Sequence, residues 1–346
     1  MKYGAHSSNP LESLAFLLGK VPIPALDALM PLLKARSIHA GVELGVFDEL
    51  AGGPLAAGEL AARLGLDLEA AEMLLRCLVA CQYLEQHGER YALAEVARRH
   101  LLRGSEKGLW AFTLWSGKLW DTIGRLDEML VSGRGFDLHD SPATPEDQAL
   151  YQRAMLEIAR LHASRLAEQI ELPPGAKRML DIAGSHGLFA AELVRRNPGL
   201  SAEVLDLESA LEHARALARE EGIDGLVKHR GGDLSAAELG EGELDLVFLA
   251  NILHHFPPAQ NLELLRRVHR ALLPGGQVAI WDIEPAPAGS KAGIGDLAGL
   301  FFRLTSGART YRPEEYGGWL REAGFAAVKT RRILSLPGYA LVLARK

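Results

Sequence analysis

The sequence predicts an α/β protein in which a doubly wound, mostly parallel sheet of seven strands follows a mainly helical N-terminal region. Three observations lead to this fold class. Strands and helices alternate strictly after Pro174, a glycine-containing turn joins the first of these strands to the first helix, and residues 55–93 show a helix–helix–hairpin pattern. Strict alternation of this kind is typical of a parallel sheet that helices cover on both faces.

The composition favours a protein that acts on a small molecule. The chain has 346 residues and a formal net charge of -6, and this length suits about two domains. Binding to nucleic acid or to an anionic membrane needs clustered Lys and Arg side chains, which an acidic chain does not favour. We therefore expect a small-molecule acceptor, no nucleic-acid partner and no membrane partner.

The cysteines and the N-terminal residues favour a cytoplasmic location. Cys77 and Cys81 lie in an apolar helical pattern, which is more typical of two buried thiols in a reducing compartment than of a disulfide or a zinc site. Residues 1–20 lack the pattern of a signal peptide. The apolar stretch 11–33 is interrupted by charges and prolines, so no membrane-spanning helix is expected.

Residues 1–103 are predicted to form a winged-helix domain. Asp67 is a plausible N-cap for the second of two short helices, and a His-Gly turn separates two short runs of strand-forming residues. The expected elements are helices within residues 10–50, 55–65 and 67–80, and strands over residues 83–86 and 91–93.

A winged helix can bind DNA, but the composition of this one favours packing and dimerisation. The segment Leu68–Ala80, which would be the recognition helix, contains one Arg, two Glu and mostly aliphatic residues. A helix that reads a DNA groove needs basic and amide side chains. We therefore expect a homodimer formed through the N-terminal domain.

Residues 104–172 are predicted to form a helical linker that contributes to the substrate pocket. Residues 133–145 read as a linker or a pocket lid, and a long helix is expected from about Pro145 to Ile170. Three tryptophans recur every five residues, which spreads them around a helix and favours roles in packing. They are Trp110, Trp115 and Trp120.

Residues 173–346 are predicted to form the Rossmann-like catalytic domain. A short helix is expected between the third and fourth strands, and a long excursion over residues 285–312 follows the fifth. The expected strands end at Asp181 and span residues 202–206, 226–231, 244–251, 277–283, 326–333 and 339–344, and the main helices span residues 187–196, 209–221, 261–273 and 313–323.

The segment from Arg178 to Asp206 is typical of half of a nucleotide site. Its first strand ends in Asp181, a turn with Gly184 and Gly187 opens a helix, and Asp206 ends the next strand, where an acid can bind ribose hydroxyls. The patterns G-x-G-x-x-G and G-x-x-x-x-G-K-[ST] are both missing. Each acid alone could be an exposed carboxylate or a helix cap. Together with Asp233 after the third strand, they favour S-adenosylmethionine.

A possible base lies at the end of the fourth strand. His254 faces the same crevice and could accept a proton from a hydroxyl group, whereas His255 is less suited to act. A satisfied structural histidine is the alternative. Asp282 and Glu284, near the end of the fifth strand, share a face, and either could orient His254. No metal site is expected, because the ligand spacing of metal sites is missing.

With these residues assembled, the catalytic half resembles the class I S-adenosylmethionine-dependent methyltransferases. The whole chain from about residue 25 resembles the small-molecule O-methyltransferases typified by the caffeic acid and bacterial antibiotic or pigment enzymes. The segments that are similar to this family are LDIAGSHG, AEVLDLESAL, GGDL, ILHHF, LLPGGQVAI and SGARTYRPEEYGGWLREAGF.

This resemblance implies a role for each matching residue. Gly184 and Gly187 would lie under the methionine part of the cofactor, Asp206 would bind the ribose, and Asp233 with Leu234 would bracket the adenine. The other cofactor-binding residues that it implies are Asp181, Leu207 and Ala250. His254 would be the general base and Asp282 the acid in contact with it, and Met155 and Phe302 would line the acceptor pocket.

The sequence departs from the family pattern at three places. Ala183 and Ser185 occupy two of the glycine positions of D-x-G-x-G-x-G. His255-Phe256 replaces the Asp-Trp that usually follows the base. Ala308 occupies the position of a second acid in plant relatives, which leaves Asp282 as the main candidate to orient His254.

The resemblance implies transfer of a methyl group from S-adenosylmethionine to a hydroxyl oxygen, with S-adenosylhomocysteine as the product. We expect an aromatic or polyketide-like secondary metabolite as the acceptor. Two alternatives stay open. One is a homologue that uses the bound cofactor for decarboxylation, hydroxylation or rearrangement, and the other is a ligand-sensing transcription factor. The sequence does not identify the acceptor or distinguish oxygen, nitrogen and carbon as the atom methylated.

Overall fold

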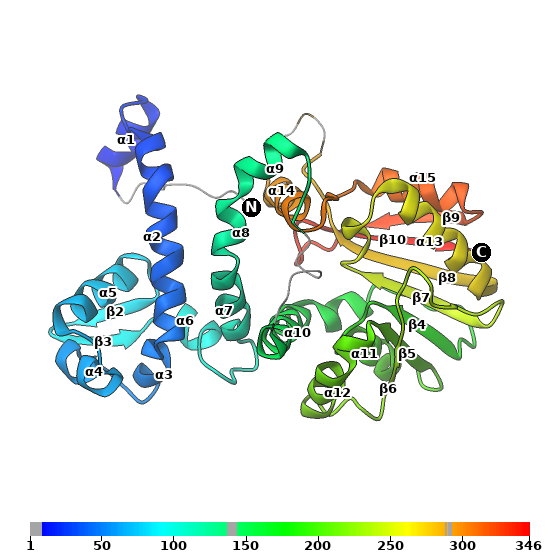
Figure 1. Ribbon diagram of the computed structural model, residues 1–346, viewed down its shortest axis with the longest axis horizontal. Coiled ribbons are helices and arrows are strands. Elements are labelled where there is room, and N and C mark those ends of the chain that lie inside the picture. The colour runs from blue at the N-terminus through cyan, green and yellow to red at the C-terminus, as the bar shows by residue number, and fades with distance from the viewer. Residues whose placement is uncertain (1–8, 137–143, 288, 290–292) are drawn as a thin grey trace. The chain divides into compact units, whose positions relative to one another are not determined.

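The computed structural model describes residues 9–136, 144–287, 289 and 293–346. These form two compact units, one that ends at Leu119 and one that runs from Trp120 to Lys346 (Figure 1). The boundary between the two units falls within residues 104–172. That these residues form a separate helical linker stays a prediction. Most of the expected pocket lid, residues 137–143, lies outside the described residues.

The N-terminal unit contains the expected helix–helix–hairpin. Helix α4 ends at Leu64 and is capped by Gly65, whose left-handed φ of 66° favours glycine. Asp67 caps α5 by accepting a hydrogen bond of 2.9 Å from the N–H of Ala70. Strand β1 joins the two expected strands in an antiparallel sheet of order β1-β3-β2, so the winged helix is confirmed. The elements are α1 (Pro10–Leu17), α2 (Ile23–Glu43), α3 (Val46–Leu50), β1 (Leu55–Ala56), α4 (Ala57–Leu64), α5 (Leu68–Ala80), β2 (Leu84–His87), β3 (Arg90–Leu93), α6 (Glu95–His100) and α7 (Trp110–Lys118).

The apolar side chains of this unit divide between a closed core and an exposed surface. Leu75 and Leu78 of α5 are completely buried in a core that includes Phe47 and Tyr91. We call the exposed apolar side chains of α1 and α2 the α1–α2 surface: Leu11, Leu14, Leu17, Leu18, Ile23, Leu29, Met30, Leu32 and Leu33. In the part of the chain that the structure describes, no helix is long and apolar enough to cross a membrane.

The second unit is built on a seven-stranded sheet of order β6-β5-β4-β7-β8-β10-β9. Neighbouring strands from β6 to β8 are parallel, and β10 is antiparallel to both β8 and β9. The predicted doubly wound, mostly parallel sheet is confirmed. The elements are α8 (Trp120–Gly124), α9 (Leu126–Ser132), α10 (Pro145–Ala167), β4 (Arg178–Ile182), α11 (Leu188–Arg196), β5 (Ser201–Asp206), η1 (Glu208–Ala210), α12 (Leu211–Glu220), β6 (Val227–Gly231), β7 (Leu244–Ala250), η2 (Leu253–His255), α13 (Pro258–Ala271), β8 (Leu272–Ile283), α14 (Ile294–Ser306), α15 (Pro313–Glu322), β9 (Ala326–Arg331) and β10 (Tyr339–Arg345).

The strand order reverses at β4, and this reversal locates the candidate site. From β4 the chain adds β5 and β6 on one side and then returns to place β7 on the other. In open α/β sheets, ligands bind in the crevice outside the carboxyl ends of the strands at such a switch point. The carboxyl ends of β4 and β7 are therefore where a cofactor site is expected.

Each face of the sheet packs against its own set of helices. Met179, Phe248 and Trp281 belong to the core that includes buried side chains of α10, α11 and α12. Leu180 and Ile280, on the opposite face, belong to the core with buried side chains of α13 and α15 (Figure 1). Successive residues of a strand point to opposite faces of the sheet. Two neighbouring residues at the end of one strand can therefore contact different layers of helices.

Two local features differ from the expectation. The prediction of a short helix between the third and fourth strands is wrong, because residues 234–236 form a turn. Asp233 starts this turn by accepting a hydrogen bond from the N–H of Ser235 at 2.8 Å, and an Asx turn competes with a helix for the main chain. The excursion over residues 285–312 contains a helix, α14, that the sequence pattern did not single out.

Candidate active site

The turn between β4 and α11 has an unusual main-chain conformation. Ala183, Ser185 and Gly187 have φ values of 57°, 44° and 77°, which all lie in the left-handed region. A side chain with a Cβ atom is strained there, at a cost of about 1–2 kcal/mol for each residue. Ala183 and Ser185 are the residues found where the family pattern has glycine. They therefore adopt the glycine conformation despite their side chains.

Hydrogen bonds from three directions hold Ser185 in this conformation. Its main-chain N–H donates to Oδ2 of Asp206 at 2.8 Å. Its carbonyl oxygen accepts from Nε2 of His229 at 3.0 Å, and its hydroxyl group donates to Oε1 of Gln152 at 3.3 Å. A strained conformation persists only where its surroundings enforce it, and these contacts provide that enforcement.

His186 connects the same turn to α10. The N–H of Leu188 donates to Nδ1 of His186 at 3.0 Å, and the ring also hydrogen-bonds to the main-chain carbonyl of Met155. Burial lowers the pKa of His186 to about 3, so the imidazole is neutral near pH 7. A neutral ring can accept at one nitrogen while it donates at the other, as this position requires.

Two carboxyl groups lie beside the turn. Asp206 ends β5 and accepts from the main-chain N–H groups of Ser185 and Leu207, the latter at 2.8 Å. Asp181, in β4, is completely buried, and both of its carboxyl oxygens have no hydrogen-bond partner among the described residues. Burial, reinforced by the charge of Asp206, raises the pKa of Asp181 well above its usual value.

The arrangement fits a cationic ligand that contains a ribose. A Cβ atom at Gly184 would lie 2.5 Å from Oδ2 of Asp181, so only glycine lets the main chain cross directly over this carboxyl group. A buried carboxyl group without a partner is costly, and a nearby cation would offset that cost. A carboxylate has about four positions for accepting hydrogen bonds, so Asp206 is of the type that can bind ribose hydroxyl groups.

The loop after β6 is fastened to α13. Asp233 is exposed and its carboxylate binds the N–H of Ser235, which lowers the pKa of Asp233. Arg267 of α13 donates to the main-chain carbonyl of Leu234 at 2.6 Å and also to that of Ala237. Arg267 thus fixes the segment in which the resemblance places the adenine.

His254 lies in the turn η2, which follows β7 after Asn251 and Ile252. Its Nδ1 is 2.5 Å from Oδ1 of Asp282, and both side chains are buried. Ala250, the last residue of β7, is half-buried at the same edge of the sheet. Glu284 instead forms a two-pronged ion pair with Arg332, with a shortest distance of 2.7 Å. The structure thus places Asp282, and not Glu284, against His254.

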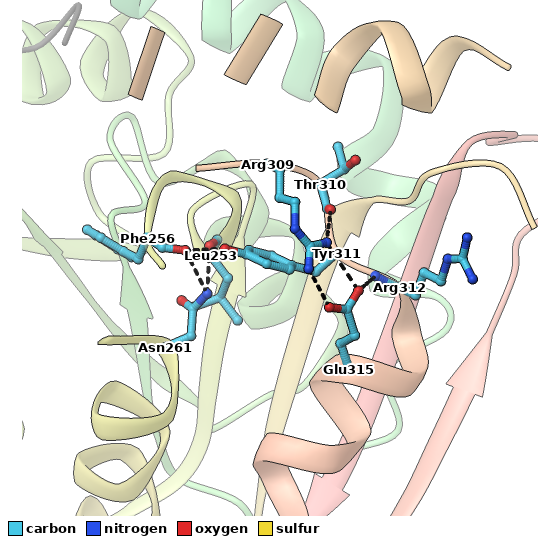
Figure 2. A network of polar contacts seen from close by, with 8 residues as sticks. All are labelled: Leu253, Phe256, Asn261, Arg309, Thr310, Tyr311, Arg312 and Glu315. Carbon is cyan, nitrogen blue, oxygen red and sulfur yellow. Dashed lines mark hydrogen bonds and ion pairs between the residues drawn. The ribbon is translucent and has the colours of Figure 1, made fainter. Parts of the chain in front are cut away.

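A network of polar contacts holds the turn that contains His254 (Figure 2). The amide nitrogen of Asn261 donates to the carbonyl oxygens of Leu253 and Phe256 at 2.9 and 3.1 Å. The hydroxyl group of Tyr311 donates to the same carbonyl oxygen of Phe256 at 2.7 Å. The main chain on both sides of His254 is therefore fixed by side chains of α13 and of the segment before α15.

Comparison with known proteins gives the family. A model of the family described as the O-methyltransferase domain matches residues 129–326, more than half of the chain. The chain belongs to the O-methyltransferase family. A second model, described as the O-methyltransferase dimerisation domain, matches residues 28–103 of this O-methyltransferase. The resemblance inferred from the sequence is confirmed.

The relatives include enzymes named for different acceptor atoms. This O-methyltransferase is 32% identical over 326 residues to the tetracenomycin polyketide synthesis 8-O-methyl transferase TcmO of Streptomyces glaucescens, which covers 90% of this chain and 94% of that one. It is 30% identical over 328 residues to the N,N-dimethyltransferase OxyT of Streptomyces rimosus, with 90% and 93% covered. Its fold is similar to that of human N-acetylserotonin methyltransferase in complex with S-adenosylmethionine, with a TM-score of 0.83, 21% identity and 99% of both chains covered.

The two residues expected to line the acceptor pocket have different places in this O-methyltransferase. The ring of Phe302, in α14, stacks on the imidazole of His254 with centroids 3.7 Å apart and an angle of 17°. Met155 lies in α10, where its side chain is half-buried and its carbonyl binds His186. The structure thus brings Phe302 to the proposed base and places Met155 beside the glycine turn.

Sequence reasoning missed several residues that hold this site. Asn261, Tyr311 and Tyr316 support the His254 turn or Asp282. Arg267 supports the loop after β6. The only signal was that both tyrosines fall in the segment SGARTYRPEEYGGWLREAGF, which is similar to the family. Among the described residues, no group of three or more His, Cys, Asp or Glu side chains could hold a metal ion.

Proposed function

We propose that this O-methyltransferase methylates a hydroxyl group of an aromatic or polyketide-like small molecule, with His254 as the general base. The observation that favours this function most is the buried His254–Asp282 pair, 2.5 Å apart, at the carboxyl edge of the sheet. The glycine turn and Asp206 lie at the same edge. A base and a cofactor site at one edge suit a reaction that removes a proton during group transfer.

S-adenosylmethionine is the cofactor, and when bound it supplies an electrophilic methyl group on a sulfonium and leaves as S-adenosylhomocysteine. We assign its methionine part to the turn at Gly184 and Gly187 and its ribose to Asp206. The unpartnered carboxyl group of Asp181 supports the binding of a cation at this turn. The remaining cofactor-binding residues of the proposal are Leu207, Asp233, Leu234 and Ala250.

The hydrogen bond to Asp282 determines which nitrogen of His254 can act as the base. Nδ1–H donates to the carboxylate, so the lone pair of the neutral ring is on Nε2. Nε2 would take the proton of the acceptor hydroxyl and so leave the oxygen able to accept a methyl group. Asp282 then stabilises the imidazolium. Base catalysis of this kind contributes about 10²–10⁴-fold to the rate, and positioning of the reactants contributes separately.

The names of the relatives support the acceptor class and also define the competing reaction. TcmO, which is named for O-methylation in polyketide synthesis, supports a hydroxyl acceptor on an aromatic polyketide. OxyT is named as an N,N-dimethyltransferase, so an amine acceptor is the second candidate. The His254–Asp282 pair favours the hydroxyl group, because a neutral amine can attack a methyl group without prior removal of a proton.

Replacement of His254 by Gln tests the proposed base. We expect turnover on phenols and hydroxynaphthoic acids to fall about 10²–10⁴-fold, because the replacement removes a general base. Turnover is measured as release of S-adenosylhomocysteine together with the mass of the product. The dissociation constant of S-adenosylmethionine, measured by calorimetry, should stay nearly unchanged.

His255→Asn is the matched control, because it alters the neighbouring imidazole and keeps the His254–Asp282 pair. It should retain far more turnover than His254→Gln. Equal turnover of wild type and His254→Gln on a productive acceptor would exclude His254 as the base. A product whose mass does not increase by one methyl group would support decarboxylation, hydroxylation or rearrangement instead. Methylation of amines alone would support the second candidate.

A further inference from the structure

The carboxylate of Asp282 is held by three donors, and only one of them is the proposed base. Oδ1 accepts from His254 at 2.5 Å and from the main-chain N–H of Ile283 at 2.8 Å. Oδ2 accepts from the phenol hydroxyl of Tyr316 at 2.9 Å. Tyr316 lies in α15 and is 2% exposed. The hydrogen bond of Tyr316 is therefore buried and lies on the side of the carboxylate away from His254.

The surroundings keep the hydroxyl group of Tyr316 a donor. Burial, followed by the charge of Asp282 and the hydrogen bond itself, raises the pKa of Tyr316 well above its usual value. The other titratable groups that interact with Asp282 are His254 and the two tyrosines Tyr311 and Tyr339, whose pKa values burial also raises. Arg309 and Glu315 lie nearby as an ion pair. The phenol therefore stays protonated near neutral pH and can donate its hydrogen bond.

The ring of Tyr316 is fixed as well as its hydroxyl group. Trp319 and Tyr311 contact it edge to face, with ring centroids 5.6 and 6.0 Å from that of Tyr316. Glu315 accepts from the N–H of Arg312 at 2.9 Å and pairs with Arg309 at 2.7 Å, which secures the first turn of α15 (Figure 2). A donor on such a support can hold one carboxylate orientation.

We propose that Tyr316 is a positioning residue for the base: its hydroxyl group anchors Oδ2 of Asp282 so that Oδ1 stays aligned with Nδ1 of His254. This inference rests on the proposed role of His254. The second constraint on the pair is thus a phenol that acts on the acid.

The hydrogen bond from Tyr316 also affects how strongly the carboxylate of Asp282 can stabilise a positive charge on His254. A donor at Oδ2 withdraws part of the negative charge that would otherwise stabilise the imidazolium. Loss of this donor should therefore strengthen the interaction of the carboxylate with the imidazolium. The acid limb of the pH profile would move to higher pH, while the carboxylate gains freedom to rotate away from the imidazole.

The variant Tyr316→Phe tests this role. We expect kcat to fall about tenfold, comparable to the loss of one hydrogen bond to a charged group, with KM for the acceptor nearly unchanged. The midpoint of the acid limb of kcat should move to higher pH, because a hydrogen bond to the carboxylate has been removed. In the His254→Gln background, where the base is missing, the same replacement should have little further effect on turnover measured with radiolabelled methyl groups.

Tyr311→Phe is the matched control, because it removes a buried tyrosine hydroxyl that binds a main-chain carbonyl in place of the carboxylate. It should lower Tm by about as much as Tyr316→Phe does. The midpoint of the acid limb of kcat should stay at the wild-type pH. If Tyr316→Phe lowers kcat without moving that midpoint, or lowers it equally in the His254→Gln background, Tyr316 is only structural and the inference fails. Full activity of His254→Gln alone would instead overturn the proposed function.

Discussion

At the scale of single residues, the most telling feature is a left-handed main chain at residues that are not glycine. Ala183 and Ser185 have φ values of 57° and 44° within the turn that we assign to the cofactor. The strain at Ser185 is balanced by its hydrogen bonds with Asp206, His229 and Gln152. The N–H of Ala183 donates to the carbonyl oxygen of Leu205 at 2.7 Å. The loss of glycine in the family pattern therefore changes the stability of the turn and leaves its shape intact.

The variant Ala183→Gly should make the protein more stable. Relief of the left-handed strain favours folding by about 1–2 kcal/mol, and the greater freedom of glycine in the unfolded chain opposes it by about 0.4–1 kcal/mol. The net gain expected in the free energy of unfolding by urea is thus roughly 0.5–1 kcal/mol. Ala216→Gly, at an exposed position within α12, is the control and should lose about 1 kcal/mol. Equal losses in both variants would contradict the strain argument.

The choice between Asp282 and Glu284 shows what the sequence could decide at this scale. Alternation along an ideal strand puts both carboxylates on one face, so the residues alone left both candidates open. In the structure β8 ends at Ile283, and Glu284 turns to Arg332. Where a strand ends depends on its neighbours in the sheet, and this information is not local to the sequence.

At the scale of elements, α13 connects two parts of the candidate site. Asn261 in its first turns holds the main chain around His254, and Arg267 two turns later holds the loop after β6. The same helix therefore fixes the position of the proposed base and of the proposed adenine site. A rigid helix suits this task better than a loop, because it keeps both distances constant.

Arg267→Ala should weaken binding of the cofactor. The guanidinium donates to the carbonyl oxygens of Leu234 and Ala237, and its loss leaves the adenine loop without this support. We expect the dissociation constant of S-adenosylmethionine to rise about tenfold, the equivalent of one charged hydrogen bond, with kcat at saturating cofactor nearly unchanged. Arg266→Ala removes a neighbouring guanidinium that pairs with Glu322 on the surface, and it should bind the cofactor normally. Equal affinities of the two variants would show that Arg267 has no such role.

Most strands of the sheet could be predicted from the sequence, whereas the supports of the site could not. Apolar runs that end in an acid or a turn, such as the one before Asp181, are local signals. The contact from Tyr311 to Phe256 joins residues far apart in the chain, and no local pattern records it. The missed turn after β6 has a similar cause, because the Asx turn at Asp233 and the contacts of Arg267 outweigh a weak preference for helix.

At the scale of the whole molecule, the α1–α2 surface stands out as an apolar area that no other described residue covers. The match of residues 28–103 to a dimerisation domain includes most of α2. Leu29 and Leu33 of α2 are 50% and 51% exposed. Large exposed apolar areas on a folded protein commonly mark a protein interface. We therefore infer that a second copy of the chain covers this surface.

The double variant Leu29→Glu, Leu33→Glu should be monomeric. The two side chains are one helical turn apart on α2, so two carboxylates there would be desolvated and close together in the interface. Light scattering should give twice the mass of the chain for the wild type and the mass of one chain for the variant. Met73→Glu, a charge at an exposed position of α5, is the control and should remain dimeric. A wild-type monomer, or a variant that remains dimeric, would refute the assignment of this surface.

The proposed base and the turn that we assign to the cofactor lie in different layers of the second unit. By alternation along the strands, Asp181 and Asp206 face the layer with α10, α11 and α12. Asp282 faces the layer with α13 and α15, to which its partner Tyr316 belongs. Mutations around Asp282 and Tyr316 can therefore modify proton removal without changing the glycine turn and Asp206, whereas changes in α13 would affect both the proposed base and the adenine loop. This arrangement offers a physical route by which relatives named for methylation of oxygen and of nitrogen diverged on one fold. Selection could change the residues around the base and keep the turn that we assign to the methyl donor.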